Sequence, residues 1–224
     1  MRTRGKPRGF TLAELVLALA ITTVIGLAVT AVAAAVSQIN QEAEAYYEYL
    51  QNGRVAASRI EKALRSALLV TAASDDEFVV WMKDENDDGE INVSEVARVY
   101  LDDGDHKLLM QTTEFPDDMK KGQRQALDVD LELDGLTEVE NLDLGTGHAA
   151  HDVLRLLARN VESFHVYPDV EPPMTRLLKF TLVVGENGQT VTQYGAVTLR
   201  APRIDRVRQQ DGQYLLLDGD DGDE

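Results

Sequence analysis

The chain has 224 residues, no cysteine and a formal net charge of −17 at pH 7. Its length allows one membrane segment and one globular domain of ordinary size. The acidic balance argues against a nucleic-acid surface, because phosphate binding needs clustered Lys and Arg. The absence of cysteine excludes a disulfide framework and a thiolate metal site, and it fits either side of a membrane.

A basic segment opens the chain, and a long apolar segment follows it. The basic residues are Arg2, Arg4, Lys6 and Arg8. Residues 15–36 carry no charge, and their polar side chains are Thr22, Thr23 and Thr30. A helix over this range is roughly 33 Å long, enough for the ~30 Å hydrocarbon core of a bilayer. The positive-inside rule then keeps the basic segment in the cytoplasm and sends the C-terminal domain across the membrane.

A cleaved secretory signal is the ordinary alternative for such a beginning. It would have a shorter apolar region that ends in small residues. The alanines within residues 31–35 leave a cut of this kind open on these rules alone.

The order of features at the front of the span is more specific. The stretch "RGFTLAELVLALAI" places Phe10 directly after Gly9, with Glu14 at the fifth position counted from Phe10. It resembles the leader of type IV pilins and type II secretion pseudopilins. The resemblance implies that a prepilin peptidase cuts after Gly9 on the cytoplasmic side and N-methylates Phe10. Thr11, Leu12 and Leu15 match the family's usual "FTLxEL" run.

Glu14 needs a physical explanation, because a carboxylate in hydrocarbon costs roughly 2.5–3.5 kcal/mol on insertion scales. The cost falls beside a cation, and cleavage after Gly9 creates one at the α-amino group of Phe10. The resemblance implies that Glu14 pairs with this amine on a neighbouring subunit during assembly. The simpler alternative is that Glu14 reaches back to the cytoplasmic interface.

Apolar residues continue at helical spacing after the span, with polar residues on the other side. This pattern predicts one helix from about residue 11 to residue 70, with a bend at Gly53 because glycine interrupts it. The apolar stripe indicates a helix face that packs on a sheet. Together with the leader, it predicts an α+β, pilin-like fold: a long N-terminal helix, first transmembrane and then amphipathic, packed on antiparallel β-sheet.

From Glu77 the pattern becomes strand-like, with turn residues between the runs. "GENGQ" (185–189) predicts a tight turn. Within residues 114–147, only "LDVDLELDGL" has strand character, and the acidic end after Leu217 is typical of disorder. The predicted strands are 77–83, 96–103, 106–113, 153–168 in two pieces, 176–185 and 190–202.

Residues 84–95, "DENDDGEINVSE", match the EF-hand loop template at every specified position. The template assigns side-chain oxygens to Asp84, Asn86 and Asp88, the backbone carbonyl to Glu90 and a bidentate carboxylate to Glu95. Gly89 allows the sharp turn and Ile91 anchors the loop. Because both flanks are strand-like, the sequence predicts a structural calcium site between two strands. A solvated acidic hairpin is the alternative.

Other signals are weak. His148 and His151 lie three residues apart with Asp152 adjacent, which suggests zinc, but no third ligand at a defined spacing is available, so a polar loop is the preferred interpretation. Trp81 lies on an apolar strand and is predicted to be core. No nucleophile motif or phosphate-binding glycine loop is present, so we expect no catalysis in the chain itself.

The resemblance predicts a minor pseudopilin of a type II secretion system, which joins a pseudopilus that drives proteins through the outer membrane. The stretch "LLARNVESFHVYPDVEPPMTRLLKFTLVVG" and the retained Glu14 favour the J type. The expected partners are the prepilin peptidase, other pseudopilins or pilins and the inner-membrane secretion platform. The expected parts are a cytoplasmic leader (1–9), a transmembrane half-helix (10–36), an amphipathic half-helix (37–72), a periplasmic β-rich domain (73–217) and an acidic tail (218–224).

Two other functions stay open. A minor pilin of a type IV pilus, for adhesion, motility or DNA uptake, would carry the same N-terminal features. A membrane-tethered extracytoplasmic calcium-binding domain or enzyme would keep an uncleaved anchor.

Overall fold

The computed structural model describes residues 11–86, 88–116, 118–131, 133, 151–186, 188–199, 203–210 and 212–217. The predicted Gly9–Phe10 cleavage site, His148 and the acidic tail therefore lie outside the described residues. The chain divides into two compact units, Met1–Tyr47 and Glu48–Glu224.

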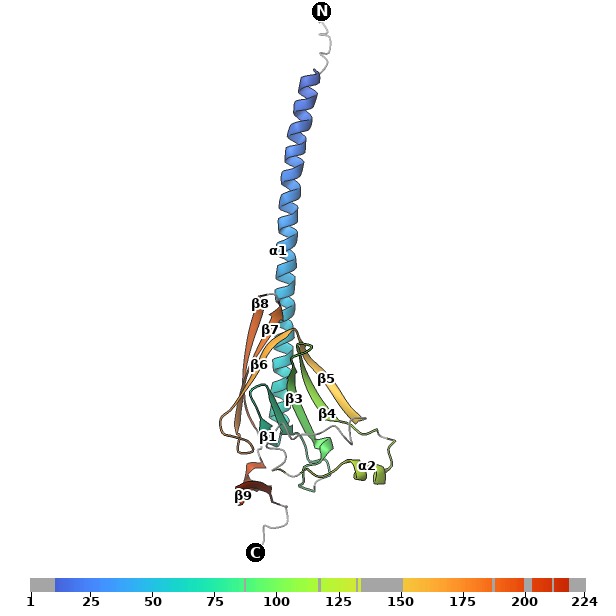
Figure 1. The fold of residues 1–224 in the computed structure, drawn as a ribbon, viewed down its shortest axis with the longest axis vertical. Coiled ribbons are helices and arrows are strands. Elements are labelled where there is room, and N and C mark those ends of the chain that lie inside the picture. The colour runs from blue at the N-terminus through green and yellow to red at the C-terminus, as the bar shows by residue number, and fades with distance from the viewer. Residues whose placement is uncertain are drawn as a thin grey trace, which may run out of the picture. The chain divides into compact units, whose positions relative to one another are not determined.

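Helix α1 (Leu12–Ser66) contributes residues to each unit (Figure 1). Its first part is rich in Leu, Val and Ala, and its large apolar side chains are exposed, as with Leu19 at 60% and Val24 at 66%. Among the described residues, this is the one helix long and apolar enough to cross a membrane.

The helix ends four residues before the predicted position, so the predicted boundary is wrong. Strand β1 (Leu69–Ala73) begins where helix was expected, and it pairs antiparallel with β2 (Glu77–Trp81). The side chains of Leu69, Val70 and Thr71 are all fully buried there. β-Branched residues that can be buried on both sides favour a strand. The free energy of this burial outweighs the helix preference that the spacing of apolar residues indicated.

Antiparallel sheets form the rest of the second unit, which confirms the α+β class. A five-stranded sheet has the order β1-β2-β3-β4-β5, and a three-stranded sheet has the order β6-β7-β8 (Figure 1). The remaining strands of these two sheets are β3 (Val96–Asp102), β4 (Lys107–Thr113), β5 (Asp152–Arg159), β6 (Val161–Pro168), β7 (Leu177–Glu186) and β8 (Gln189–Thr198).

The main core lies between the second half of α1 and the two sheets. Ile60 and Leu64 of α1 are fully buried there, in the same cluster as Phe78 of β2 and Phe164 and Phe180 of the three-stranded sheet. From Ala56 on, this packing confirms the amphipathic stripe predicted for α1. The predicted stripe also included Ile39 and Tyr46, which are 63% and 45% exposed, so for that part of the helix the prediction of a buried face is wrong.

Gly53 lies at one such close contact. A Cβ at this position would lie 3.0 Å from Gln193 Cγ and 3.6 Å from Val184 Cγ2. The helix is continuous through Gly53. The glycine provides room for β7 and β8 to approach the helix.

A second, smaller core covers the other face of the β1–β2 pair. Because side chains alternate along a strand, Phe78 and Val80 enter the main core while Val79 and Trp81 enter the second one. Trp81 is fully buried, as predicted. The C-terminal hairpin of β9 (Val207–Gln210) and β10 (Gln213–Leu216) packs against this second core. A short helix, α2 (Lys121–Leu127), follows β4 in the chain. Neither the hairpin nor α2 was predicted.

Candidate functional site

Glu14 lies in the first turn of α1, where it forms a capping box with Thr11. The Thr11 backbone N–H donates to Glu14 Oε2 at 2.9 Å, and the Glu14 N–H donates back to Thr11 Oγ1 at 3.3 Å. This reciprocal pair satisfies two N–H groups that a helix start otherwise leaves without partners. The spacing Thr-x-x-Glu is the signal for it in the sequence. The geometry adds helix capping to the two roles that the sequence suggested for Glu14.

The hydroxyl groups within the apolar part of α1 are also satisfied by the helix itself. Thr22, Thr23 and Thr30 each donate to the carbonyl four residues earlier, at 2.7, 2.8 and 2.8 Å. A donor without a partner costs several kcal/mol in hydrocarbon, so this arrangement suits a span in lipid.

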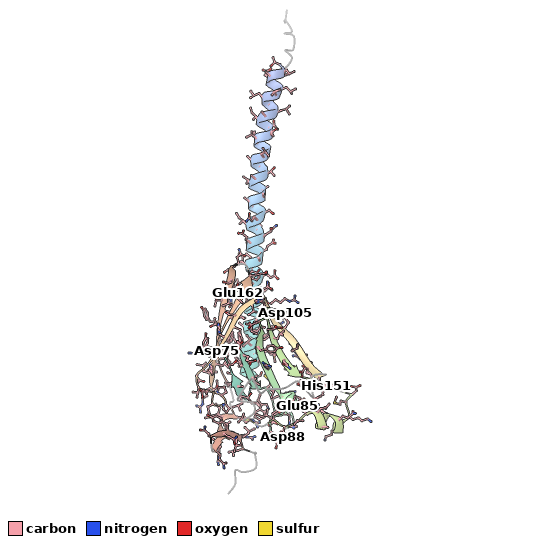
Figure 2. The ribbon with its side chains drawn as sticks, viewed as in Figure 1. Asp75, Glu85, Asp88, Asp105, His151 and Glu162 are labelled. Carbon is pink, nitrogen blue, oxygen red and sulfur yellow. The ribbon has the colours of Figure 1, made fainter. Side chains whose placement is uncertain are left out.

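The acidic loop, residues 82–95, connects β2 to β3, which pair antiparallel with Trp81 opposite Val96. The prediction of a loop between two strands is confirmed. Gly89 has φ of 82°, a conformation that favours glycine, and Ile91 is 2% exposed, so the turn and the anchor lie where the template puts them. Figure 2 shows Glu85 and Asp88 of this loop at one end of the domain and Asp105, in the β3–β4 turn, at the other.

Glu95 closes the loop and is almost fully buried, at 2% exposed. Its Oε1 accepts the Glu85 backbone N–H at 2.6 Å, and its Oε2 accepts the Trp81 indole N–H at 3.0 Å. Burial raises the pKa of Glu95 above its ordinary value, and the nearby charge of Asp84 adds to this, while the hydrogen bonds oppose it. The carboxylate is therefore well held but costly to ionise.

Asp84 is the other buried acid of the loop, with a side chain 3% exposed. Neither of its carboxylate oxygens accepts a hydrogen bond. Within the described residues, its ion-pair partner is Arg203, whose Nη1 lies 3.2 Å from Asp84 Oδ2. The same guanidinium lies over the ring of Trp81, 5.3 Å from its centroid. A buried carboxylate with open lone pairs is what an oxygen-ligated cation site requires.

The polar side chains in the middle of the loop bind one another. Asn86 donates through Nδ2 to the carboxylate of Asp88 and to Asn92 Oδ1, the latter at 2.9 Å. Asp88 Oδ1 accepts the Glu90 backbone N–H at 2.9 Å. Asn92 in turn donates to Asp130 Oδ1 at 2.5 Å.

Asp130 belongs to a segment that sequence reasoning did not connect with this loop. The backbones of residues 91–93 and 129–131 pair through Val93 N–H to Val129 O at 3.2 Å and Leu131 N–H to Ile91 O at 2.7 Å. The alternating acids of "LDVD" were the available signal. Asp128, Asp130, Arg124 and Lys121 join the loop residues in lining an open cavity of about 800 Å³.

The predicted calcium ligands are only partly brought together. Asn86, Asp88 and the Glu90 backbone lie in one hydrogen-bonded group, and Asp84 is near enough to Glu95 to affect its pKa. Within the described residues, no group of three or more His, Asp or Glu side chains is arranged to hold a metal ion. The calcium site stays a prediction.

The histidine pair does not gain a ligand set in the part of the structure that is described. The His151 ring packs against Phe115, with the ring centroids 5.3 Å apart, and its backbone carbonyl accepts the Glu114 N–H at 3.0 Å. These contacts agree with a structural role for His151, which directly precedes the first residue of β5 and is labelled in Figure 2.

Comparison with known families gives one match. Residues 4–36 match the family described as the prokaryotic N-terminal methylation motif. No curated protein and no solved structure matches the chain. The matched range contains Gly9, Phe10 and Glu14, so it supports a type IV pilin-like or pseudopilin protein that is processed by a prepilin peptidase and assembles with other pilins. With the apolar part of α1, the motif fits a membrane-anchored chain.

Proposed function

We propose that the chain is a minor pseudopilin of the J type, a structural subunit of the pseudopilus of a type II secretion system. Its N-terminus lies in the cytoplasm, α1 anchors it in the inner membrane, and the β-rich domain faces the periplasm. The observation that carries this proposal is Glu14, a carboxylate in the first turn of an apolar helix, inside a matched methylation motif. The chain is then a substrate of the prepilin peptidase and catalyses no reaction itself.

In this proposal, Glu14 of one subunit attracts the α-amine of Phe10 on its neighbour. An opposite charge offsets much of the cost of a carboxylate in hydrocarbon, so the pair favours subunits that are side by side over separate ones. The capping box does not compete with this role, because Thr11 engages Oε2 and a carboxylate has about four acceptor positions.

The capping box does dictate the experiment, since Glu14→Ala would remove the cap and the charge together. Glu14→Gln keeps a capping-box residue and removes the charge. Thr11→Ala keeps the charge and removes the hydroxyl. We expect Glu14→Gln to abolish cross-linking into filaments while membrane insertion stays normal, and Thr11→Ala to assemble.

Assembly of Glu14→Gln at the wild-type level, together with failure of Thr11→Ala, would assign Glu14 to helix capping and contradict the assembly role. Loss of membrane insertion in Glu14→Gln would contradict it as well. A minor pilin of a type IV pilus would give the same results, and genomic neighbours separate the two: a secretion ATPase and secretin, or pilus retraction genes.

We also propose that the acidic loop binds a structural calcium ion through Asp84, Asn86, Asp88, the carbonyl of Glu90 and Glu95. The support is the pair of buried carboxylates, the two Asp84 oxygens without hydrogen bonds, and the turn at Gly89. The ion would supply positive charge to a loop whose acids otherwise repel one another. Calorimetry with calcium chloride and a chelator tests it: heat and increased thermal stability are expected, and neither would appear if the loop is only solvated.

A further inference from the structure

Arg203 connects the C-terminal part of the chain to the acidic loop. Its backbone N–H donates to the carbonyl of Leu68 at 2.8 Å, just before β1. Its guanidinium reaches Asp84 at 3.2 Å and covers the face of Trp81. Ile204 beside it is 7% exposed and belongs to the second core. The arginine is thus fixed at its backbone and directed into the loop.

The charge around Trp81 is not balanced by Arg203 alone. Asp84 and Glu95 are both nearly fully buried, and Glu95 is bound by neutral N–H groups, not by a cation. Lys83, the nearest lysine in sequence, pairs with Glu85 at 2.8 Å instead. Burying a net negative charge is costly, so a stronger positive charge at Asp84 would be favoured over the single guanidinium.

The present positions of Asp84 and Glu95 also explain why the predicted ligands do not converge. Asp84 is held beside Arg203, and Glu95 is held by the Trp81 indole and the Glu85 amide. An ion coordinated by both carboxylates would lie within a few ångströms of the guanidinium. Two positive charges at that distance, beside two buried side chains, repel each other.

We propose that Arg203 is a built-in competitor of the cation: the guanidinium and a calcium ion bind Asp84 in turn. This inference rests on the proposed calcium site. Arg203 sets the affinity of that site, because the ion must displace the guanidinium from Asp84. Displacement also removes a contact that fixes the segment from η4 (Arg203–Arg206) through β10, so calcium loosens the C-terminal hairpin.

The test titrates calcium chloride into the full-length chain in detergent micelles at constant ionic strength. Arg203→Gln is compared with the wild type and with Arg208→Gln, which makes the same charge change on an exposed residue of β9. Heat and Trp81 fluorescence are recorded, and Trp81 is the only tryptophan in the sequence. We expect Arg203→Gln to bind calcium about tenfold more tightly, because the ion no longer has to displace a guanidinium that is ion-paired with Asp84, and Arg208→Gln to match the wild type.

Hydrogen exchange gives a second readout in the same samples. In the wild type, calcium should speed exchange of the amides in residues 203–217. In Arg203→Gln, exchange there should be fast already and should not respond to calcium. Arg203→Lys keeps the positive charge without the planar fork and should lie between the two, which keeps the test available if Arg203→Gln does not fold.

The outcomes separate the two proposals. Equal affinity in wild type and Arg203→Gln overturns competition and leaves the calcium site standing. Weaker binding in Arg203→Gln also overturns it, because Arg203 would then position Asp84 for the ion. Absence of calcium binding in both proteins contradicts the calcium site itself and the inference with it.

Discussion

The two parts of α1 show how one helix can have opposite requirements along its length. In residues 12–47, apolar side chains such as Leu19 and Ile39 are about 60% exposed. In residues 48–66, Ile60 and Leu64 are fully buried by the chain's own sheets. The first part therefore depends on partners outside the chain, which are lipid and neighbouring subunits in the proposed function, while the second part depends on the fold.

The glycines repeat this contrast. A Cβ added to Gly26 would meet nothing within 4 Å, whereas one added to Gly53 would meet β8 and β7 side chains. The two glycines have the same intrinsic cost in a helix. Only the second glycine is required by packing inside the chain.

The largest difference is expected for truncation of apolar side chains. Ile60→Ala should lower the free energy of unfolding of the β-rich domain by ~2–5 kcal/mol, because it leaves a cavity in the main core. Leu19→Ala should change it by less than ~0.5 kcal/mol. Denaturant unfolding of the chain in detergent, followed by Trp81 fluorescence, measures both. A similar loss for Leu19→Ala would break the comparison.

Enlarging the glycines should have a smaller effect. Gly53→Leu should destabilise the domain by ~1–3 kcal/mol, because Gln193 and Val184 leave no room for the side chain. Gly26→Leu has free space and better helix propensity, so the same unfolding measurement should show no loss. Equal tolerance at both positions would mean that β7 and β8 move aside easily.

The smallest effect concerns Glu95, a buried acid of the second unit whose oxygens accept hydrogen bonds but have no cationic partner among the contacts described. Its pKa is raised by burial, so its contribution to stability is fully present below its unfolded pKa near about 4.3 and is lost as pH rises through its folded pKa. In metal-free buffer, the unfolding free energy of the wild type minus that of Glu95→Gln should decrease between pH 4 and 7.5. A constant difference would show that Glu95 ionises without cost.

Much of the fold followed from residue patterns. Alternation and turn residues located β2 to β8, including the division of 153–168 into two strands, which the structure places at Asn160 (φ 53°), and the turn between Glu186 and Gln189. β1 was missed because both of its faces are buried, which leaves no alternation to detect. The hairpin β9–β10 was missed because its strands are short and mostly exposed, and only the second core holds them in place.

The candidate sites divide in the same way. Glu14 and the acidic loop could be found because their signals lie within a few consecutive residues. Arg203 could not, since nothing local marks it, and the acids of "LDVD" that include Asp130 do not indicate which loop they contact. Folding brings each of them to the loop. Arg203 is 119 positions from Asp84 in the sequence, and Asp130 is 38 positions from Asn92.

The mature N-terminus tests the central claim most directly. The full-length chain, expressed with a prepilin peptidase and purified from membranes, should have a mass that corresponds to removal of residues 1–9 and addition of one methyl group, with N-methyl-Phe10 as its first residue. An intact Met1 would contradict the account and favour a permanent anchor. A first residue after the alanines of 31–35 would contradict it too, and would identify an ordinary secretory signal.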